Sequence, residues 1–305
     1  DLLSSYGSES PPLLDKLGNN RWQERKTRLK RKLFEIADKL ISIAAIRQTQ
    51  SAPTYTPDTG VYEEFCARFS YTETEDQLNA IDHIAEDLAR GKPMDRLICG
   101  DVGFGKTEVA LRAAMMVLAG GKGAQVAILA PTTLLARQHY QLCSMRFKGF
   151  GIKIAQLSRL VSAKEANQIK QGLEVGEIDL VIGTHSLLSN VKFKNLALLI
   201  IDEEQHFGVA QKEKLKEMRK QTHVLTMTAT PIPRTLQLSM TGIKDLSIIA
   251  TPPVDRLVVK TFVTPYDATV IKQAIEYERN RGGKCFYVAP RVNDLEELEL
   301  SLRQL

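Results

Sequence analysis

Apolar positions follow two different spacings along the chain, and the change between them divides it. From Asn20 to about Arg47, apolar residues recur at intervals of three, four and seven, which predicts one long amphipathic helix. Its apolar stripe consists of Trp22, Leu29, Leu33, Ile36, Leu40 and Ala44. Beyond residue 60, short apolar runs alternate with helical stretches, which is typical of βαβ units around a parallel sheet. We therefore expect an α/β fold that follows a linker helix.

The same runs place the individual elements. Strands are expected at residues 96–99, 125–130, 153–157, 180–182, 197–201 and 223–227. Helices are expected at residues 78–88, 108–118, 134–146 and 163–174. Two prolines, Pro252 and Pro253, then break the pattern. A second α/β unit is expected after them, with a strand at 257–263, a helix at 268–280 and a strand at 284–288.

Composition narrows the class of protein. Of the 305 residues, 43% are hydrophobic and 25% are charged, as in ordinary soluble globular proteins. The longest apolar run, residues 196–201, is too short to cross a bilayer, and the first residues lack the pattern of a secretion signal. The four cysteines have neither metal-binding nor disulfide spacing. We expect a cytoplasmic protein without a membrane segment.

The net charge of +5 is too small to indicate a partner by itself. Basic residues are concentrated between positions 21 and 32, in the first half of the expected linker helix. Such a segment can face a polyanion or plain solvent, and charge alone leaves both interpretations open.

Gly100 to Thr107 reads GDVGFGKT, which fits the phosphate-loop pattern GxxxxGK[ST] directly between an expected strand and an expected helix. Glycines at 100, 103 and 105 allow backbone N–H groups to turn towards phosphates. Lys106 can place its ammonium on the β- and γ-phosphate oxygens, and the Thr107 hydroxyl can bind Mg²⁺. The motif predicts a nucleoside triphosphate site.

Two further motifs are expected at the same sheet edge. Asp202 and Glu203 follow an apolar strand, where Asp202 would hold the Mg²⁺ shell and Glu203 would orient and deprotonate the attacking water. Thr228 and Thr230 follow the next strand, where their hydroxyls could sense the γ-phosphate through the carboxylates and couple its state to a neighbouring lobe.

Gln77 lies before an expected helix, with Phe69 upstream. The glutamine amide could read an adenine edge while the phenyl ring stacks on the base. By itself, a glutamine at a helix start is more often plain surface.

Taken in order, these motifs resemble those of superfamily 2 helicases. They comprise Gln77, the phosphate loop, Pro131-Thr132-Thr133, Gly183-Thr184-His185, the acidic motif at 202–205 and Thr228-Ala229-Thr230. The run TATPIPRT from Thr228 resembles the group that contains the branch-migration helicase RecG and the bacterial transcription-repair coupling factors. GDVGFGKTEVA from Gly100 and IATPPVDRLVVKTFV from Ile249 resemble the coupling factors within that group.

This resemblance implies a RecA-like parallel sheet sandwiched by helices, within four segments. Residues 1–19 would end an upstream polymerase-binding domain, 20–52 form the linker helix, 53–251 the first motor lobe, and 252–305 the truncated start of a second RecA-like lobe. The implied nucleotide contacts are Phe69, Gln77, Gly100, Gly103, Gly105, Lys106, Thr107 and Glu108.

The resemblance also implies ATP and Mg²⁺ as cofactors and ATP-driven translocation on double-stranded DNA. The parent activity would displace a stalled RNA polymerase, bound through the upstream domain, and recruit excision-repair proteins. Sequence-independent phosphate contacts are implied for Thr132, Thr133, Arg159, Thr184, His185 and Arg234.

Two departures from the family pattern bear on activity. His206 stands where the family usually has arginine, and the arginine finger of the second lobe would lie beyond Leu305. We therefore expect the 305-residue chain to hydrolyse ATP weakly by itself. Alternative functions are the motor lobe of a RecG-type branch-migration helicase and a nucleotide-gated interaction module. A small-molecule kinase would share the phosphate loop without the later motifs.

Overall fold

The computed structural model describes residues 26–28, 30–31, 49–56, 59–188, 191–218, 222–230, 245–254 and 260–304. The chain divides into two compact units, Asp1–Arg256 and Leu257–Leu305. Residues 26–28, 30 and 31 are helical, but the apolar stripe proposed for the linker helix lies outside the described residues. The amphipathic linker helix over residues 20–52 therefore stays a prediction.

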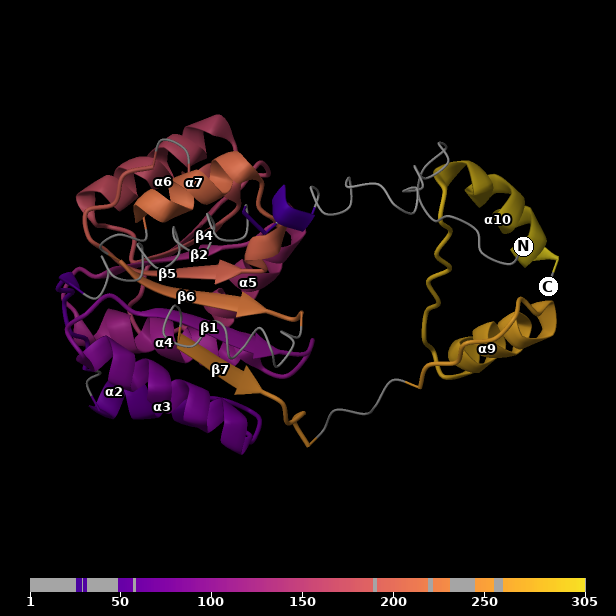
Figure 1. Cartoon of the computed structure of the whole chain (residues 1–305), viewed down its shortest axis with the longest axis horizontal. Coiled ribbons are helices and arrows are strands. Elements are labelled where there is room, and N and C mark those ends of the chain that lie inside the picture. Colours follow the sequence, from indigo (N-terminus) through magenta and orange to yellow (C-terminus); the bar gives the residue numbers. More distant parts are fainter. Residues whose placement is uncertain are drawn as a thin grey trace. The chain divides into compact units, whose positions relative to one another are not determined.

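The first unit is built on a seven-stranded sheet in the order β3-β4-β2-β5-β6-β1-β7, in which every paired strand is parallel (Figure 1). The strands are β1 (Asp95–Gly100), β2 (Gln125–Leu129), β3 (Ile154–Leu157), β4 (Leu180–Gly183), β5 (Leu196–Asp202), β6 (His223–Thr228) and β7 (Asp245–Ile249). The helices are α2 (Thr59–Ala67), α3 (Glu75–Ala89), α4 (Lys106–Gly120), α5 (Thr133–Arg146), α6 (Ala163–Val175) and α7 (Val209–Met218), with short 3-10 turns at His185–Leu188 and Glu204–His206.

Helices cover both faces of this sheet, and the strand residues alternate between two cores. Ile128 and Ile200 pack with α2, α3, α4 and α5 in one core. Leu129 and Ile201 pack with α6 and α7 in the other (Figure 1). A strand buried on both faces reads as a continuous apolar run, which is why the sequence pattern located these strands. The expected α/β fold with a RecA-like parallel sheet is confirmed.

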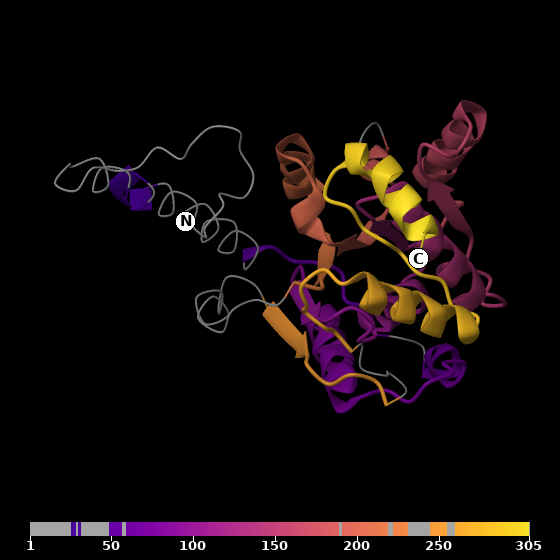
Figure 2. The same ribbon diagram turned by 90° about the vertical axis from the view of Figure 1, so that its right-hand side faces the viewer.

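The second unit contains α9 (Ala268–Asn280), the 3-10 turn Val292–Asp294 and α10 (Leu295–Arg303) (Figure 2). The strand expected at residues 284–288 is wrong, since this segment has no regular structure and Phe286 is 96% exposed. Residues 260–263 also form no strand. A strand is stable only when its backbone groups are paired, and the described part of this unit offers no strand to pair with.

Sheet order determines where the motifs meet. Strands β5, β6 and β1 are neighbours, and each carries a predicted motif at its carboxyl end. Residue pairs Asp202↔Met227 and Cys99↔Thr228 align these ends in register. In a parallel sheet the loops beyond the carboxyl ends form the ligand crevice. The fold therefore brings the phosphate loop, the acidic pair and the threonine motif to one edge.

Candidate nucleotide-binding site

The phosphate loop connects β1 to α4. Its turn uses two glycines in the left-handed region, Gly103 with φ 78° and Gly105 with φ 79°, a conformation that glycine adopts without a Cβ penalty. The Lys106 ammonium donates to the carbonyl oxygens of Gly100 at 2.6 Å and Asp101 at 2.9 Å. These are bonds that a phosphate could replace.

Burial lowers the pKa of Lys106, while the carboxylates of Glu203, Asp202 and Asp101 act in the opposite direction. The lysine is therefore within electrostatic reach of the acidic pair. This relationship joins the two motifs into one site, although Lys106 and Asp202 are 96 positions apart in sequence.

Glu203 is held in a strained conformation by the next strand. With φ 49°, it is the one non-glycine residue of positive φ in the described part of the chain. Its backbone N–H donates to the carbonyl of Met227 at 2.9 Å. Its carboxylate accepts from the Ala229 N–H at 2.7 Å and the Thr228 hydroxyl at 3.2 Å, and also from the Gln205 amide.

The threonine motif continues this network. The hydroxyls of Thr228 and Thr230 lie 2.8 Å apart, and the Thr230 N–H donates to the Thr228 hydroxyl at 3.2 Å. Because Glu203 and Thr228 share a hydrogen bond, a displacement of the carboxylate would be felt at the start of the TATPIPRT run. The rest of that run, from residue 231 onward, lies outside the described residues.

Asp202 has a partner that sequence analysis missed. The ring nitrogen Nε2 of His139, on α5, lies 2.9 Å from Asp202 Oδ2. The two residues are 63 positions apart, so no spacing rule connects them. Only the placement of His139 on the buried face of a predicted helix could have drawn attention to it.

Gln77 links α3 to the phosphate loop. It forms a capping box with Thr74, in which its Oε1 accepts from the Thr74 N–H at 3.0 Å. Its Nε2 donates to the Phe104 carbonyl at 2.8 Å. Both ends of the amide are thus bonded within the protein, and an adenine edge would have to compete with these partners. Adenine reading by Gln77 stays a prediction.

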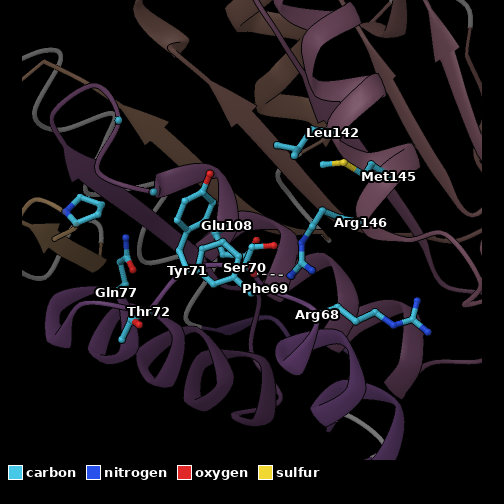
Figure 3. A pocket seen from close by; sticks show the side chains of 13 residues that line it. Arg68, Phe69, Ser70, Tyr71, Thr72, Gln77, Glu108, Leu142, Met145 and Arg146 are labelled. Atoms are coloured by element: carbon cyan, nitrogen blue, oxygen red, sulfur yellow. Dashed lines mark hydrogen bonds and ion pairs between the residues drawn. The ribbon is translucent and has the colours of Figure 1, made fainter. Parts of the chain in front are cut away.

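A pocket of about 560 Å³ opens beside the phosphate loop (Figure 3). Its walls include Gln77, Gly103 and Gly105 together with the segment from Arg68 to Thr72. This volume is in the range of pockets that bind small ligands. The apolar walls suit a flat base with one end open to the phosphate loop.

Phe69 forms part of this pocket and is held by its neighbours. Its ring lies 5.5 Å from that of Tyr71, and the guanidinium carbons of Arg112 and Arg146 lie 5.7 Å and 5.6 Å from its centroid. Glu108, also expected to bind nucleotide, lines the same pocket. Its carboxylate accepts from Arg146 at 2.7 Å (Figure 3). It also accepts from Arg112 at 3.0 Å, so it supports both arginines around Phe69.

Five of the six residues expected to contact DNA follow β2, β3 and β4, on the other half of the same sheet edge. Thr132 caps α5 by accepting from the Leu135 N–H at 3.2 Å, and Thr133 begins that helix. The Arg159 guanidinium lies 3.4 Å from the His185 ring. Nucleotide motifs and expected DNA contacts are thus side by side on one edge.

Thr184 and Arg234 are also expected to contact DNA. Thr184 is only 1% exposed, and its hydroxyl lies 3.3 Å from that of Ser186. A direct contact between the Thr184 side chain and a DNA phosphate would need this side chain to become more exposed, and it stays a prediction. Arg234 lies outside the described residues.

A family model for DEAD/DEAH box helicases matches residues 74–239, which is more than half of the chain. The chain belongs to the DEAD/DEAH box helicase family. It is 55% identical to the transcription-repair-coupling factor of Rickettsia bellii, over 100% of this chain and 27% of that protein. The factor of Escherichia coli is 47% identical over 100% of this chain and 26% of its own length.

The chain therefore spans about a quarter of the length of these curated relatives. Among solved structures, RecG bound to a three-way DNA junction is 34% identical with a TM-score of 0.76, covering 93% of this chain and 38% of that one. The helicase MrfA, 14% identical with a TM-score of 0.58 over 82% of this chain and 41% of that one, shares the fold. The resemblance to the transcription-repair coupling factors is confirmed.

For a member of this helicase family, the Mg²⁺ ligands available from the protein are few. The described residues contain no cluster of three or more metal-binding side chains. Magnesium bound with a nucleotide needs only one or two protein ligands, because phosphates and waters supply the rest. The Thr107 hydroxyl at the start of α4 and the Asp202 carboxylate fit this requirement.

Within the part of the chain that is described, no helix is long and apolar enough to cross a membrane.

Proposed function

We propose that this chain binds ATP with Mg²⁺ and uses ATP hydrolysis to drive movement along double-stranded DNA. The observation that carries the proposal is that Lys106, the acidic pair and Thr228 meet at one edge of the sheet. Burial lowers the pKa of Lys106, while the negative charges of Glu203 and Asp202 raise it. Glu203 accepts hydrogen bonds from Thr228 and Ala229. A half-buried lysine beside the phosphate loop and two carboxylates at one sheet edge are groups that support phosphoryl transfer to water, and Thr228 holds one of these carboxylates.

Each residue of the candidate site has a separate role in the proposed ATP hydrolysis. Lys106 and the loop N–H groups bind the β- and γ-phosphates, with the base in the pocket beside Phe69 and Gln77. Thr107 and Asp202 hold Mg²⁺, which neutralises charge on the phosphate oxygens when bound. Glu203 accepts a proton from the attacking water as the new oxygen–phosphorus bond forms and the bond to the ADP oxygen breaks.

Binding to DNA is proposed for the neighbouring half of the same edge. Thr132, Thr133, Arg159, His185 and Arg234 would contact phosphates, which gives binding that does not depend on base sequence. The parent protein is proposed to displace stalled RNA polymerase and to bring excision-repair proteins to the site, in the cytoplasm. The name of the coupling-factor relatives supports the link between transcription and repair. RNA polymerase would be held by a domain upstream of residue 20.

A second candidate is the motor lobe of a RecG-type branch-migration helicase. The similarity to RecG at 34% identity favours it, but identities of 47–55% with coupling factors over the full chain favour the first proposal more strongly. A nucleotide-gated interaction module is a third candidate. The 305-residue chain by itself is proposed to hydrolyse ATP weakly, since the resemblance assigns an arginine finger to a second lobe.

Replacing Glu203 separates these functions. In a protein of the relatives' full length that carries this sequence, we expect Glu203→Gln to abolish ATP-dependent displacement of a triplex strand from duplex DNA. Nucleotide affinity should be retained. An interaction module would keep partner binding and its nucleotide dependence in this variant, and a RecG-type motor would act on three-way junctions in preference to linear duplex.

A further inference from the structure

His139 occupies a position where the helix pattern calls for an apolar residue. It lies on α5 between Ala136 and Cys143, both fully buried against the sheet, and is itself 9% exposed. A polar ring buried at such a place is costly unless it has a hydrogen-bond partner. Its partner, at 2.9 Å through Nε2, is Asp202 Oδ2.

The chemistry of His139 and Asp202 determines which of them donates the hydrogen bond. An ionised carboxylate can only accept, so the hydrogen lies on Nε2 of His139 and Asp202 Oδ2 accepts it. This bond uses one oxygen of Asp202 and leaves Oδ1 available at the sheet edge. The Asp202 side chain is 14% exposed, so the carboxylate is not sealed inside the protein.

The two carboxylates of the site are held by different elements. Glu203 accepts from Thr228 and Ala229 beyond β6. Among the described residues, the hydrogen bond that orients the Asp202 carboxylate comes from His139. Without it, Asp202 would be free to rotate towards the Lys106 ammonium, whose charge it already feels.

We propose that His139 is a positioning residue that fixes the Asp202 carboxylate with Oδ1 directed to the Mg²⁺–nucleotide complex. This inference rests on the proposed function, because it assumes that Asp202 serves Mg²⁺. Groups that hydrogen-bond to metal ligands in this way commonly change metal affinity by about 10- to 100-fold when they are removed.

Two amide substitutions test which nitrogen matters. The amide of glutamine reaches the position of Nε2, whereas that of asparagine reaches only the position of Nδ1. The affinity of the purified chain for a fluorescent ADP analogue is measured at increasing Mg²⁺ concentrations. The quantity compared between variants is the Mg²⁺ concentration at which the gain in affinity is half-maximal. Hydrolysis is not required for this measurement. We expect His139→Asn to raise this concentration about 10-fold and His139→Gln to stay much closer to the unsubstituted protein.

Matched measurements separate positioning from general loss of structure. Affinity for the ADP analogue in excess EDTA should be equal in the unsubstituted protein and in the His139 variants. In a protein that already carries Asp202→Asn, the further substitution His139→Asn should leave the Mg²⁺ requirement unchanged, since the histidine acts through that carboxylate. Should His139→Asn fail to fold, His139→Leu, which fills the space without a donor, takes its place with the same expectation.

An unchanged Mg²⁺ requirement in His139→Asn, or an equal effect in the Asp202→Asn background, would overturn the role assigned to His139. Failure of the proposed function looks different. In that case the unsubstituted protein would bind the ADP analogue without any dependence on Mg²⁺, or would not bind it.

Discussion

The side-chain amide nitrogen of Gln77 donates to the carbonyl oxygen of Phe104 at 2.8 Å, and this bond joins the first turn of α3 to the phosphate loop. The next residue, Gly105, has φ +79°. A Cβ built on Gly105 would overlap the same amide nitrogen. Two independent constraints therefore favour glycine at position 105, namely the positive φ of the loop and the close approach of the Gln77 side chain.

We expect Gly105→Ala to weaken nucleotide binding and to lower stability more than Gly123→Ala. Both glycines have positive φ, so both substitutions carry a backbone cost of about 1 kcal/mol. Only Gly105 has a neighbour to displace, since a Cβ on Gly123 meets nothing within 4 Å. Urea unfolding and nucleotide titration measure the two effects. Adding Gln77→Ala should reduce the extra cost of Gly105→Ala, and equal effects at both glycines would contradict the steric argument.

Lys106→Ala should weaken binding of both ATP and ADP by about 10- to 100-fold, the usual loss when a charged hydrogen bond is removed. Isothermal calorimetry with Mg²⁺ gives the affinities directly. Lys122→Ala is the control, because Lys122 is an exposed lysine just beyond the same helix. Equal affinities for the Lys106 variant and the unsubstituted protein would show that the phosphate site lies elsewhere.

Glu203→Gln should leave nucleotide affinity near its original value and lower single-turnover hydrolysis by about 10²- to 10⁴-fold, the usual contribution of a general base. Rapid quench on the full-length protein separates this step from binding. Thr228→Val removes one donor to Glu203 and should have a smaller effect on hydrolysis. A Glu203→Gln variant that hydrolyses ATP at the original rate would exclude this residue as the base.

Much of the candidate nucleotide site could be predicted to converge at one sheet edge because its signals are local. The phosphate loop is read from one short motif, and the acidic pair is recognised because it follows a strand buried on both faces. His139 could not be found this way, since its contact with Asp202 spans 63 positions and depends on how α5 packs. The spacing of Glu108 and Arg112 is a local signal of one ion pair, but nothing local indicated that Arg146 would be the second partner of the Glu108 carboxylate.

One strand was missed and another was wrongly predicted, for different physical reasons. Strand β7 lies at the edge of the sheet, and its residue Ile248 is 42% exposed. The sequence of β7 therefore lacks the continuous apolar run that revealed the central strands. Residues 284–288 have the composition of a buried strand but no partner in the described part of the second unit. Strand formation depends on pairing as much as on propensity.

The buried pair of Asp87 and Arg96 should dominate the stability of the α3 face. Asp87 Oδ2 accepts from Arg96 at 2.6 Å, and Arg96 also donates to Ser247 on β7 at 2.9 Å. Removing one partner leaves a buried charge, so Asp87→Ala should lower the free energy of unfolding by about 3 to 5 kcal/mol. Glu86→Ala, which removes an exposed partner of Arg90, should change it by less than about 1 kcal/mol. Urea unfolding of both variants tests the contrast.

Asp76 holds the chain where it leaves β7. Its carboxylate accepts from the N–H groups of Ala250 at 2.9 Å and Thr251 at 2.8 Å. Hydrogen bonds from the Thr251 side chain and from these N–H groups lower the pKa of Asp76 below its ordinary 3.8, although burial acts in the opposite direction. A carboxyl whose pKa is lowered by folding stabilises the native state above its unfolded pKa, and this contribution is lost as the pH falls through the folded pKa.

We therefore expect Asp76→Asn to destabilise the first unit by about 1 kcal/mol at pH 7, below the usual range for hydrogen bonds to a charged group because solvent screens this carboxylate. The difference from the unsubstituted protein should persist as the pH is lowered towards 3.8 and shrink below it, because the native carboxyl then becomes protonated too. Hydrogen exchange supplies a local readout: the amides of Ala250 and Thr251 should exchange faster in the variant. Asp82→Asn makes the same charge change at an exposed site on α3 and should leave both amides protected. If exchange at Ala250 and Thr251 were the same in both variants, the carboxylate of Asp76 would not be what holds this segment.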